Sequence, residues 1–456
     1  MNMAHPFSFE PFLMFGFLSI MLLMGIFLRI KLSFLQRFFF PSCLIGGILG
    51  LIVMNSGCLP FSTSRLETFA YHFFNVSFIS VGLTRGEGTY GQGSLKTGLL
   101  KGPLWMALTQ GVIFPLQALV GGLLILVFGR LGLDLFPTFG FLVPLGFEEG
   151  PGQALSIGKV WESMGFEHAA TIGLTFAAIG FFFAFFVGVP LVNRGMRKRY
   201  PGSKAVSLPG DLLRGVIAKD RPKASAGSLT MHSGNAETLA FQAALVGLVY
   251  VLTYGAVWLL GKCVGLDTAK MLWGFFFFFG LGLSLILKGV MEKMGIAHLI
   301  DPGIQRRITG CALDFLILST VAAIQLLVVW KYAVPIFVLS LSGGVLTTLV
   351  VVYLGRRIGS YQLERTAAIY GTVTGTVSCG LLLLRIVDPE FKSPVVIDLA
   401  LMNAFSLPLI GVCLVLVNGP VWWNWSVALN LLVFLGVMVA SLILLKALGL
   451  WGKAER

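Results

Sequence analysis

Hydrophobic residues run along this chain in long unbroken segments instead of alternating with polar residues. A helical segment of about 20 apolar residues spans the hydrocarbon core of a bilayer. Strands of a membrane barrel would instead alternate over about ten residues. The pattern therefore predicts an all-α polytopic membrane protein. The apolar segments cover residues 11–28, 38–54, 67–83, 103–128, 138–158, 169–192, 237–260, 271–288, 308–328, 333–354, 366–386, 395–418 and 425–446.

Two segments, 138–158 and 366–386, carry helix-breaking and polar residues at their centres. These positions are Pro144, Glu148, Glu149, Gly150, Pro151 and Gly152 in the first, and Gly371, Gly375 and Gly380 among hydroxyl residues in the second. Irregular backbone at membrane depth survives only where it is buried in protein or lines a wet cavity. We therefore expect both segments to be broken, and each to return to the side of the membrane from which it entered.

The distribution of basic residues supports this topology. The long polar stretch 193–236 is predicted to be a cytoplasmic linker, because it is rich in Lys and Arg. If the N-terminus lies outside and both broken segments are re-entrant, only six of the 33 Lys and Arg residues lie outside. Those six are Arg65, Arg130, Lys159, Lys262, Lys270 and Lys331. A full crossing by 138–158 would turn the basic linker outward, and the C-terminus is accordingly expected inside.

Re-entrant segments at matching positions give two similar halves. Residues 1–192 and 237–418 each hold five crossings and one re-entrant segment in the same order. An odd number of crossings inverts the second half relative to the first. Inverted repeats with interrupted segments mark the binding site of many secondary transporters. Residues 419–456 are predicted to add one transmembrane helix outside the repeats.

Composition narrows the function classes. The chain is 56% hydrophobic and 12% charged, so its net charge of +13 is interpreted as cytoplasmic Lys and Arg, not as a nucleic-acid surface. No P-loop sequence is present, which disfavours an ATP-driven pump. The five histidines show no metal-ligand spacing, and no catalytic set converges. We expect no enzyme activity and no cofactor, with lipid and a small solute as the partners.

A series of short motifs is distributed along both halves of the chain, and their order and spacing are informative. They are Phe34-Leu35, Pro41, Gly46-Gly47, Ser80-Val81-Gly82-Leu83, Gly152, Trp161-Glu162, Gly165-Phe166, Gly180, Pro190, Arg306-Arg307, Arg356 and Gly371. Through these motifs the chain resembles the bacterial sodium/glutamate symporter family, to about residue 418. The resemblance implies Na⁺-coupled uptake of an acidic amino acid across the inner membrane. It also implies two inverted five-helix repeats with glycine-rich re-entrant loops, and a homodimer.

The chain departs from that family at the two loops. The family has a Gly-Gly-x-Gly type motif in its first loop, whereas here the stretch is Glu148-Glu149-Gly150-Pro151-Gly152. Its second loop is equally glycine-rich, whereas here the stretch is Gly371-Thr372-Val373-Thr374-Gly375-Thr376. The resemblance therefore bears more directly on the fold than on the substrate.

Glu148 and Glu149 are the leading candidate site residues, because an ionisable residue at membrane depth is a functional hypothesis by default. The pair could coordinate Na⁺ through carboxylate oxygens. Alternatively one of them could carry a proton, because adjacent carboxylates do not readily ionise together. A third interpretation is that the loop tip reaches water and the pair is simply solvated.

The loop residues around the pair are candidates of a second kind. Gly150, Gly152, Gly371 and Gly375 allow close backbone approach to a ligand, or serve ordinary helix packing. The hydroxyls could bind a cation or a carboxylate, or bond back to the preceding turn. The hydroxyl residues are Thr372, Thr374, Thr376 and Ser378. The amide of Gln153 is a further candidate.

Two charged residues lie outside the loop tips. Asp314 lies well inside the segment 308–328, where it could be a third Na⁺ ligand or pair with a basic residue of another helix. Arg385 ends the second broken segment and could clamp a substrate carboxylate, or pair locally with Asp388. Asp398 and Asn403 are weaker candidates.

The sequence thus predicts a secondary active transporter, and the resemblance implies that it lies in the bacterial inner membrane. We expect Na⁺-coupled symport of glutamate or a related amino acid or small carboxylate by alternating access. A channel built from paired re-entrant loops and an H⁺-coupled carrier of another substrate are the alternatives.

Overall fold

The described part of the chain is all-helical, as predicted. The computed structural model describes residues 9–57, 62–84, 100–199, 210–219, 223, 225–389 and 393–452, and within these ranges every regular element is a helix. Among the described residues, seven helices are long and apolar enough to cross a membrane, or eight if a bent pair counts as one span. These helices indicate a multi-pass membrane protein.

The helices group into two compact units, and each unit draws segments from both sides of the linker. Unit 1 comprises the described parts of Met1–Gly91 and Arg214–Leu326, and unit 2 those of Gln92–Leu213 and Leu327–Arg456. The predicted halves are continuous in sequence, whereas the compact units are not.

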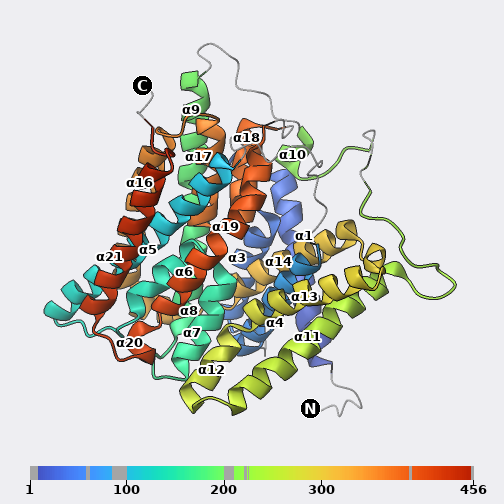
Figure 1. Cartoon of the computed structure of the whole chain (residues 1–456), viewed down its shortest axis with the longest axis horizontal. Helices are drawn as coiled ribbons and strands as arrows, with labels where there is room; N and C mark the ends of the chain where they lie inside the picture. Colours follow the sequence, from blue (N-terminus) through green and yellow to red (C-terminus); the bar gives the residue numbers. More distant parts are fainter. Residues whose placement is uncertain are drawn as a thin grey trace. The chain divides into compact units, whose positions relative to one another are not determined.

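The main contact of unit 1 is the packing of a helix with polar residues near its centre, the last of the unit, against two earlier helices. Its main helices are α1 (Glu10–Lys31), α3 (Ser42–Asn55), α4 (Thr63–Thr84), α11 (Thr238–Lys262), α12 (Leu266–Gly274), α13 (Phe276–Lys293) and α14 (Pro302–Ala322). α14 packs against α3 and α4 (Figure 1). At one end of the contact between α4 and α14, Ser80 donates to the side chain of Gln305, which in turn donates to Gln242 of α11. The three buried polar residues satisfy one another, as a buried network must.

Unit 2 is built around the long helix α5 (Lys101–Arg130). Its other elements are a 3₁₀ turn (Phe139–Phe141), α6 (Leu142–Phe147), α7 (Pro151–Glu162), α8 (Ala169–Phe182), a π-helical turn (Phe183–Val187), α9 (Gly188–Arg199), α15 (Leu326–Lys331), α16 (Ala333–Gly355), α17 (Gln362–Thr374), α18 (Val377–Val387), α19 (Val395–Leu416), α20 (Gly419–Trp422) and α21 (Val427–Ala447). α5 packs against α16, α17, α19 and α21 (Figure 1). Small residues allow the closest approach, where Gly121 of α5 lies against Gly140.

Two predicted boundaries are wrong for identifiable reasons. The segment expected at 308–328 is α14, which begins at Pro302 and ends at Ala322. Asp301 fixes its start by accepting from the Ile304 N–H at 2.6 Å, and the polar residues of the first turns hid this start in the sequence. The segment expected at 169–192 continues through α9 to Arg199, because Lys and Arg are good helix formers.

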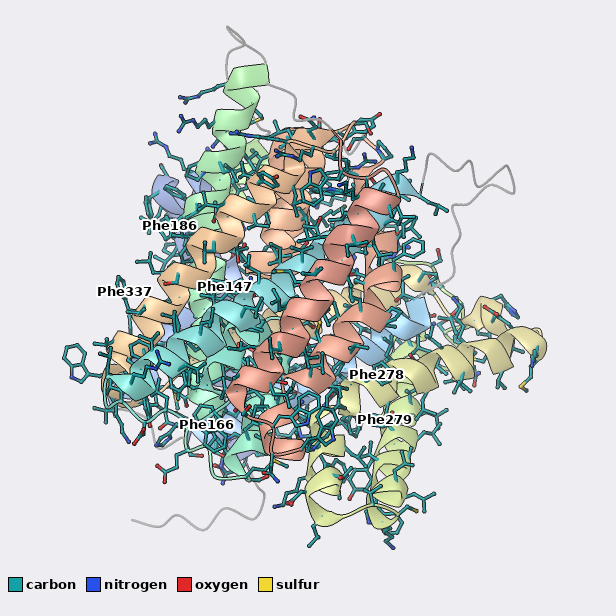
Figure 2. All side chains as sticks on the ribbon, turned by 60° about the vertical axis from the view of Figure 1, so that its left-hand side comes forward. Phe147, Phe166, Phe186, Phe278, Phe279 and Phe337 are labelled. Atoms are coloured by element: carbon teal, nitrogen blue, oxygen red, sulfur yellow. The ribbon has the colours of Figure 1, made fainter. Side chains whose placement is uncertain are left out.

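The segment expected at 271–288 is broken at Phe275, where α12 and α13 meet at an angle of 65°. Some of its phenylalanines are buried in the protein and others are exposed on its surface. Phe276 and Phe277 are buried, whereas Phe278 is 47% exposed, and Figure 2 labels Phe278 beside Phe279.

Eleven crossings were predicted, and three of the helices concerned do not have the length and apolarity of the others. α3 is only 14 residues long. α4 and α14 carry polar side chains near their centres, among them Asn75 and Asp314. That these three cross the membrane stays a prediction.

Candidate functional site

The first broken segment folds back on itself as a helical hairpin in unit 2. Gly150 has φ +85°, a left-handed conformation that favours glycine, and Pro151 directly opens α7. The two ends of the hairpin contact the same ring. Phe139, at the start, and Trp161, at the end, lie 5.8 Å and 6.3 Å from Phe166 between ring centroids. The chain therefore returns to where it started.

The second broken segment is also a hairpin. α17 ends at Thr374, α18 begins at Val377, and the two helices pack against each other. A β-carbon on Gly371 would lie 2.6 Å from the backbone nitrogen of Gly380. These two glycines therefore bring the arms of the hairpin together, and Gly371 lies inside α17 and not in the tip.

The hairpins lie along α8 and α9 and approach from opposite ends. From the start of α8, successive contacts join Gly158 to Ala170, Gly146 to Ala177, and Phe147 to Gly180. From the end of α9, they join Gly195 to Leu363, Gly188 to Tyr370, and Gly180 to the Thr374 carbonyl. Both hairpin tips thus reach Gly180, which lies part-way along the continuous helical stretch 169–199. Phe147, at the end of α6, is wholly buried there, whereas Phe337 on α16 is 66% exposed (Figure 2).

The two tips touch each other. A β-carbon on Gly150 would lie 2.8 Å from Thr376 Cγ2 and 3.4 Å from the Gly375 carbonyl oxygen. The predicted site residues of both hairpins are therefore brought together at one point in unit 2.

Unsatisfied oxygen atoms gather at the first tip. Glu148 is 4% exposed, and neither of its carboxylate oxygens has a hydrogen-bond partner among the described residues. Glu149 is half-buried and accepts from the Gln153 amide, whose own carbonyl oxygen is buried without a donor. Cys413 of α19 lies close to both carboxylates. Three buried acceptor oxygens without donors are suited to a bound cation or a proton.

The backbone of the second tip is supported by a residue that the sequence reasoning missed. Gln117, in the middle of α5, donates through Nε2 to the Val373 carbonyl at 3.1 Å and to the Thr347 hydroxyl at 3.0 Å. Val373 belongs to the last turn of α17, whose carbonyls have no partner within the helix. The signal was a glutamine in the middle of a mostly apolar segment, which also holds Thr109 and Gln110.

The hydroxyl residues divide into two groups. Thr372 and Thr374 donate to the carbonyls of Ala368 and Tyr370 at 2.9 Å and 2.7 Å, one turn back in α17. Thr376 lies in the tip itself, and Ser378 is exposed in the first turn of α18. Of the four, Thr376 is the one that contacts the opposite hairpin.

Arg385 lies away from the tip cluster, and Asp314 belongs to the other compact unit. Asp314 belongs to α14 of unit 1, where the Cys43 thiol hydrogen-bonds to its carboxylate. Arg385 lies in the last turn of α18, about 13 Å along the helix from Thr376. Among the described residues, no three His, Cys, Asp or Glu side chains are grouped to hold a metal ion.

A buried ion pair joins α17 and α19 of unit 2, with α5 packed against it, and this pair was also missed. Arg365 of α17 and Asp398 of α19 are 2.8 Å apart from Nη2 to Oδ2, and their side chains are 6% and 3% exposed. Arg365 also donates to the Ser360 carbonyl and hydroxyl, and Gly102 of α5 lies directly against the pair. Asp398, a weak site candidate in the sequence, is thus held in an ion pair.

Comparison of the chain with models of known protein families, with curated proteins and with solved structures finds no match.

Replacing Gly150 by Ala is expected to destabilise the protein by about 1–3 kcal/mol, because a side chain at φ +85° is strained and would press on Thr376. Thermal unfolding in detergent measures this. The matched control is Gly129→Ala in α5, where a β-carbon meets nothing within 4 Å. That change should be neutral or slightly stabilising. Equal behaviour of the two variants would contradict the strained, close-packed tip.

Proposed function

We propose that this protein is a secondary active transporter, a Na⁺-coupled symporter of an amino acid or small carboxylate that works by alternating access. The observation that carries the proposal is the meeting of two hairpin tips beside the buried Glu148 carboxylate, which has no hydrogen-bond partner among the described residues. Interrupted helices whose ends converge inside a membrane protein are the usual construction of a transporter's binding site.

The chemistry of the tips suits a cation and an anion together. Within the part of the chain that the structure describes, the acceptor oxygens of Glu148 and Gln153 lack donors, so a bound cation or a proton would satisfy them. The N-termini of α7 and α18 lie at the tips without a side-chain cap, and helix N-termini attract anions. A bound Na⁺ beside Glu148 would then favour a substrate carboxylate at the helix N-termini. Each ligand would raise the affinity of the other, which is the thermodynamic requirement for coupling.

Burial at the tips favours a carrier over an open channel. Glu148 is 4% exposed at the first tip and Thr374 is wholly buried where α17 ends, while Thr376 in the second tip is half-buried. A continuous pore through the tips would instead expose these side chains to water. The family resemblance supports the same proposal, with two inverted repeats, a homodimer and the bacterial inner membrane as its further elements.

A ligand screen on the purified protein tests the proposal. Thermal unfolding would be measured with acidic amino acids, dicarboxylates and tricarboxylates, each in Na⁺ and in choline. A ligand at about 100 times its Kd stabilises the folded state by about 2.7 kcal/mol. We expect one acidic solute to raise the unfolding temperature, and to do so more strongly in Na⁺ than in choline.

Uptake into proteoliposomes completes the test. Saturable accumulation driven by a Na⁺ gradient is the expected result. Ohmic conductance would identify a channel, and accumulation driven by a pH gradient without any Na⁺ effect would identify an H⁺-coupled carrier.

A further inference from the structure

Helix α16 of unit 2 exposes a stripe of large apolar side chains along one face. The stripe consists of Phe337, Leu341, Val345, Leu349 and Tyr353, each at least 44% exposed (Figure 2). A spacing of four positions places these residues on neighbouring turns of the same side of a helix. α16 has 23 residues and is apolar enough to cross a membrane. Because it is about 34 Å long, its two ends lie near the lipid headgroups when it spans a bilayer.

Two arginines follow the apolar stripe of α16. Arg356 and Arg357 lie three and four positions after Tyr353, so they continue the same face at the end of the helix. The Arg357 guanidinium lies over the Tyr353 ring, 3.6 Å from its centroid, and its Nη1 donates to the Tyr353 carbonyl at 2.9 Å. Among the described residues, neither arginine forms an ion pair with a carboxylate. Their charges are therefore available to a bound anion.

The segment that follows α21 joins the end of this helix to the end of α16. Gly449 has φ +65°, and a left-handed residue at this position satisfies the last carbonyls of a helix and reverses the chain. Trp451 then packs edge-on against Tyr353, with ring centroids 6.0 Å apart. The Gly452 N–H donates to the Arg357 carbonyl at 2.9 Å. The basic end of α16 thus lies against the C-terminal segment.

α21 carries a second apolar stripe, and this stripe is also followed by a basic residue. It consists of Leu432, Leu435, Val439 and Ile443, each at least 42% exposed. Lys446 is exposed in the last turn of the helix, three positions after Ile443, so it continues this face. Each of the two joined helices therefore presents apolar side chains along its length and a positive charge at its end. A phospholipid with a negative headgroup has the complementary arrangement, with acyl chains next to a phosphate.

We propose that the ends of α16 and α21 form a binding site for an anionic phospholipid. Arg356 and Arg357 bind the phosphate through charge-assisted hydrogen bonds, and Lys446 adds positive charge at the adjoining helix end. Basic residues beside membrane helices bind anionic headgroups in this way. The acyl chains lie along the two apolar stripes. Tyr353 and Trp451 lie at the headgroup level, where aromatic side chains are common in membrane proteins. The site is independent of the proposed transport function.

Thermal unfolding of the full-length protein in detergent tests the site. The probes are dioctanoyl phosphatidylglycerol, dioctanoyl phosphatidylcholine with the same chains, and inorganic phosphate. We expect phosphatidylglycerol to raise the unfolding temperature in a saturable manner and the other two to have no such effect, because binding needs the negative charge and the chains together. Equal stabilisation by phosphatidylcholine would overturn the proposal. Equal stabilisation by inorganic phosphate would identify a site for a soluble anion and would also overturn it.

Neutral substitutions test the two arginines. Arg356→Gln combined with Arg357→Gln is expected to weaken the apparent affinity for phosphatidylglycerol about 30-fold, because each basic residue beside an anionic headgroup contributes about fivefold. The matched control is Arg130→Gln combined with Lys331→Gln, which removes two exposed basic residues from the end of α5 and from the turn before α16. The control should stay within about threefold of the parent. Equal losses in the two double variants would show a response to surface charge in general and contradict the site.

A charge-conserving variant distinguishes a binding site from general attraction. Arg356→Lys combined with Arg357→Lys keeps both charges and removes the planar guanidinium groups, one of which is stacked on Tyr353. We expect binding at least about threefold weaker than in the parent, whereas general attraction predicts no change. Each affinity is measured from the shift relative to that variant's own unfolding temperature without lipid, so a change in basal stability does not mask the result. Parental affinity in the lysine variant would overturn the proposal.

Discussion

Replacing Arg365 by Ala is expected to destabilise the protein by about 3–5 kcal/mol, because it leaves the Asp398 carboxylate buried without a counter-charge. The substitution also removes the donors to Ser360, so the start of α17 loses its ties to the preceding loop and to α19. The unfolding temperature in detergent should fall well below that of the parent. Arg130→Ala, at the exposed end of α5, is the matched control and should change stability by no more than about 0.5 kcal/mol.

A double substitution distinguishes two contributions to the loss of stability: the cost of leaving one buried charge without its partner, and the loss of the ion pair itself. Asp398→Leu on its own leaves Arg365 without its carboxylate and should be about as harmful as Arg365→Ala. Arg365→Met with Asp398→Leu should recover most of the loss, because an apolar pair of similar volume replaces a buried ion pair at little cost. Additive losses in the double variant would contradict this account.

The two breaks were predictable because their causes are local. Gly150 followed by Pro151 cannot continue a helix without strain, and the structure has the turn at that position. The prediction that each broken segment returns on itself rested on counting basic residues, and the contacts of Phe139 and Trp161 with Phe166 show the first hairpin closing. Local chemistry was sufficient for the break at Gly150, whereas the side of the membrane to which each hairpin returns stays a prediction.

The contacts that support the site were not predictable, because they join residues far apart in the chain. Gln117 and Val373 are separated by 256 positions, and Arg365 and Asp398 by 33. A single polar residue in an apolar segment does not reveal its partner. The bend at Phe275 was missed for a different reason: the five phenylalanines that begin there continue the apolar segment, and the one local marker is Gly274, which ends α12.

Replacing Glu148 by Gln is expected to weaken the Na⁺ dependence of uptake by about 10- to 100-fold in apparent affinity, which is the effect of losing an interaction with a charged group worth about 1.5–3 kcal/mol. The same change should raise the unfolding temperature in choline, because it neutralises a buried carboxylate that has no partner among the described residues. Opposite effects on ligand response and on basal stability distinguish a binding residue from one that only supports the fold.

Two matched variants make the Glu148 result specific. Glu292→Gln makes the same chemical change at an exposed position of α13, and both readouts should stay at parental values. Glu149→Gln alters the neighbouring carboxylate, which is half-buried and already accepts from Gln153, so a smaller effect is expected. Unchanged Na⁺ affinity in Glu148→Gln would remove that residue from the cation site. If uptake in this variant also lost its dependence on pH, Glu148 would instead carry a proton, and the H⁺-coupled alternative would replace Na⁺ symport.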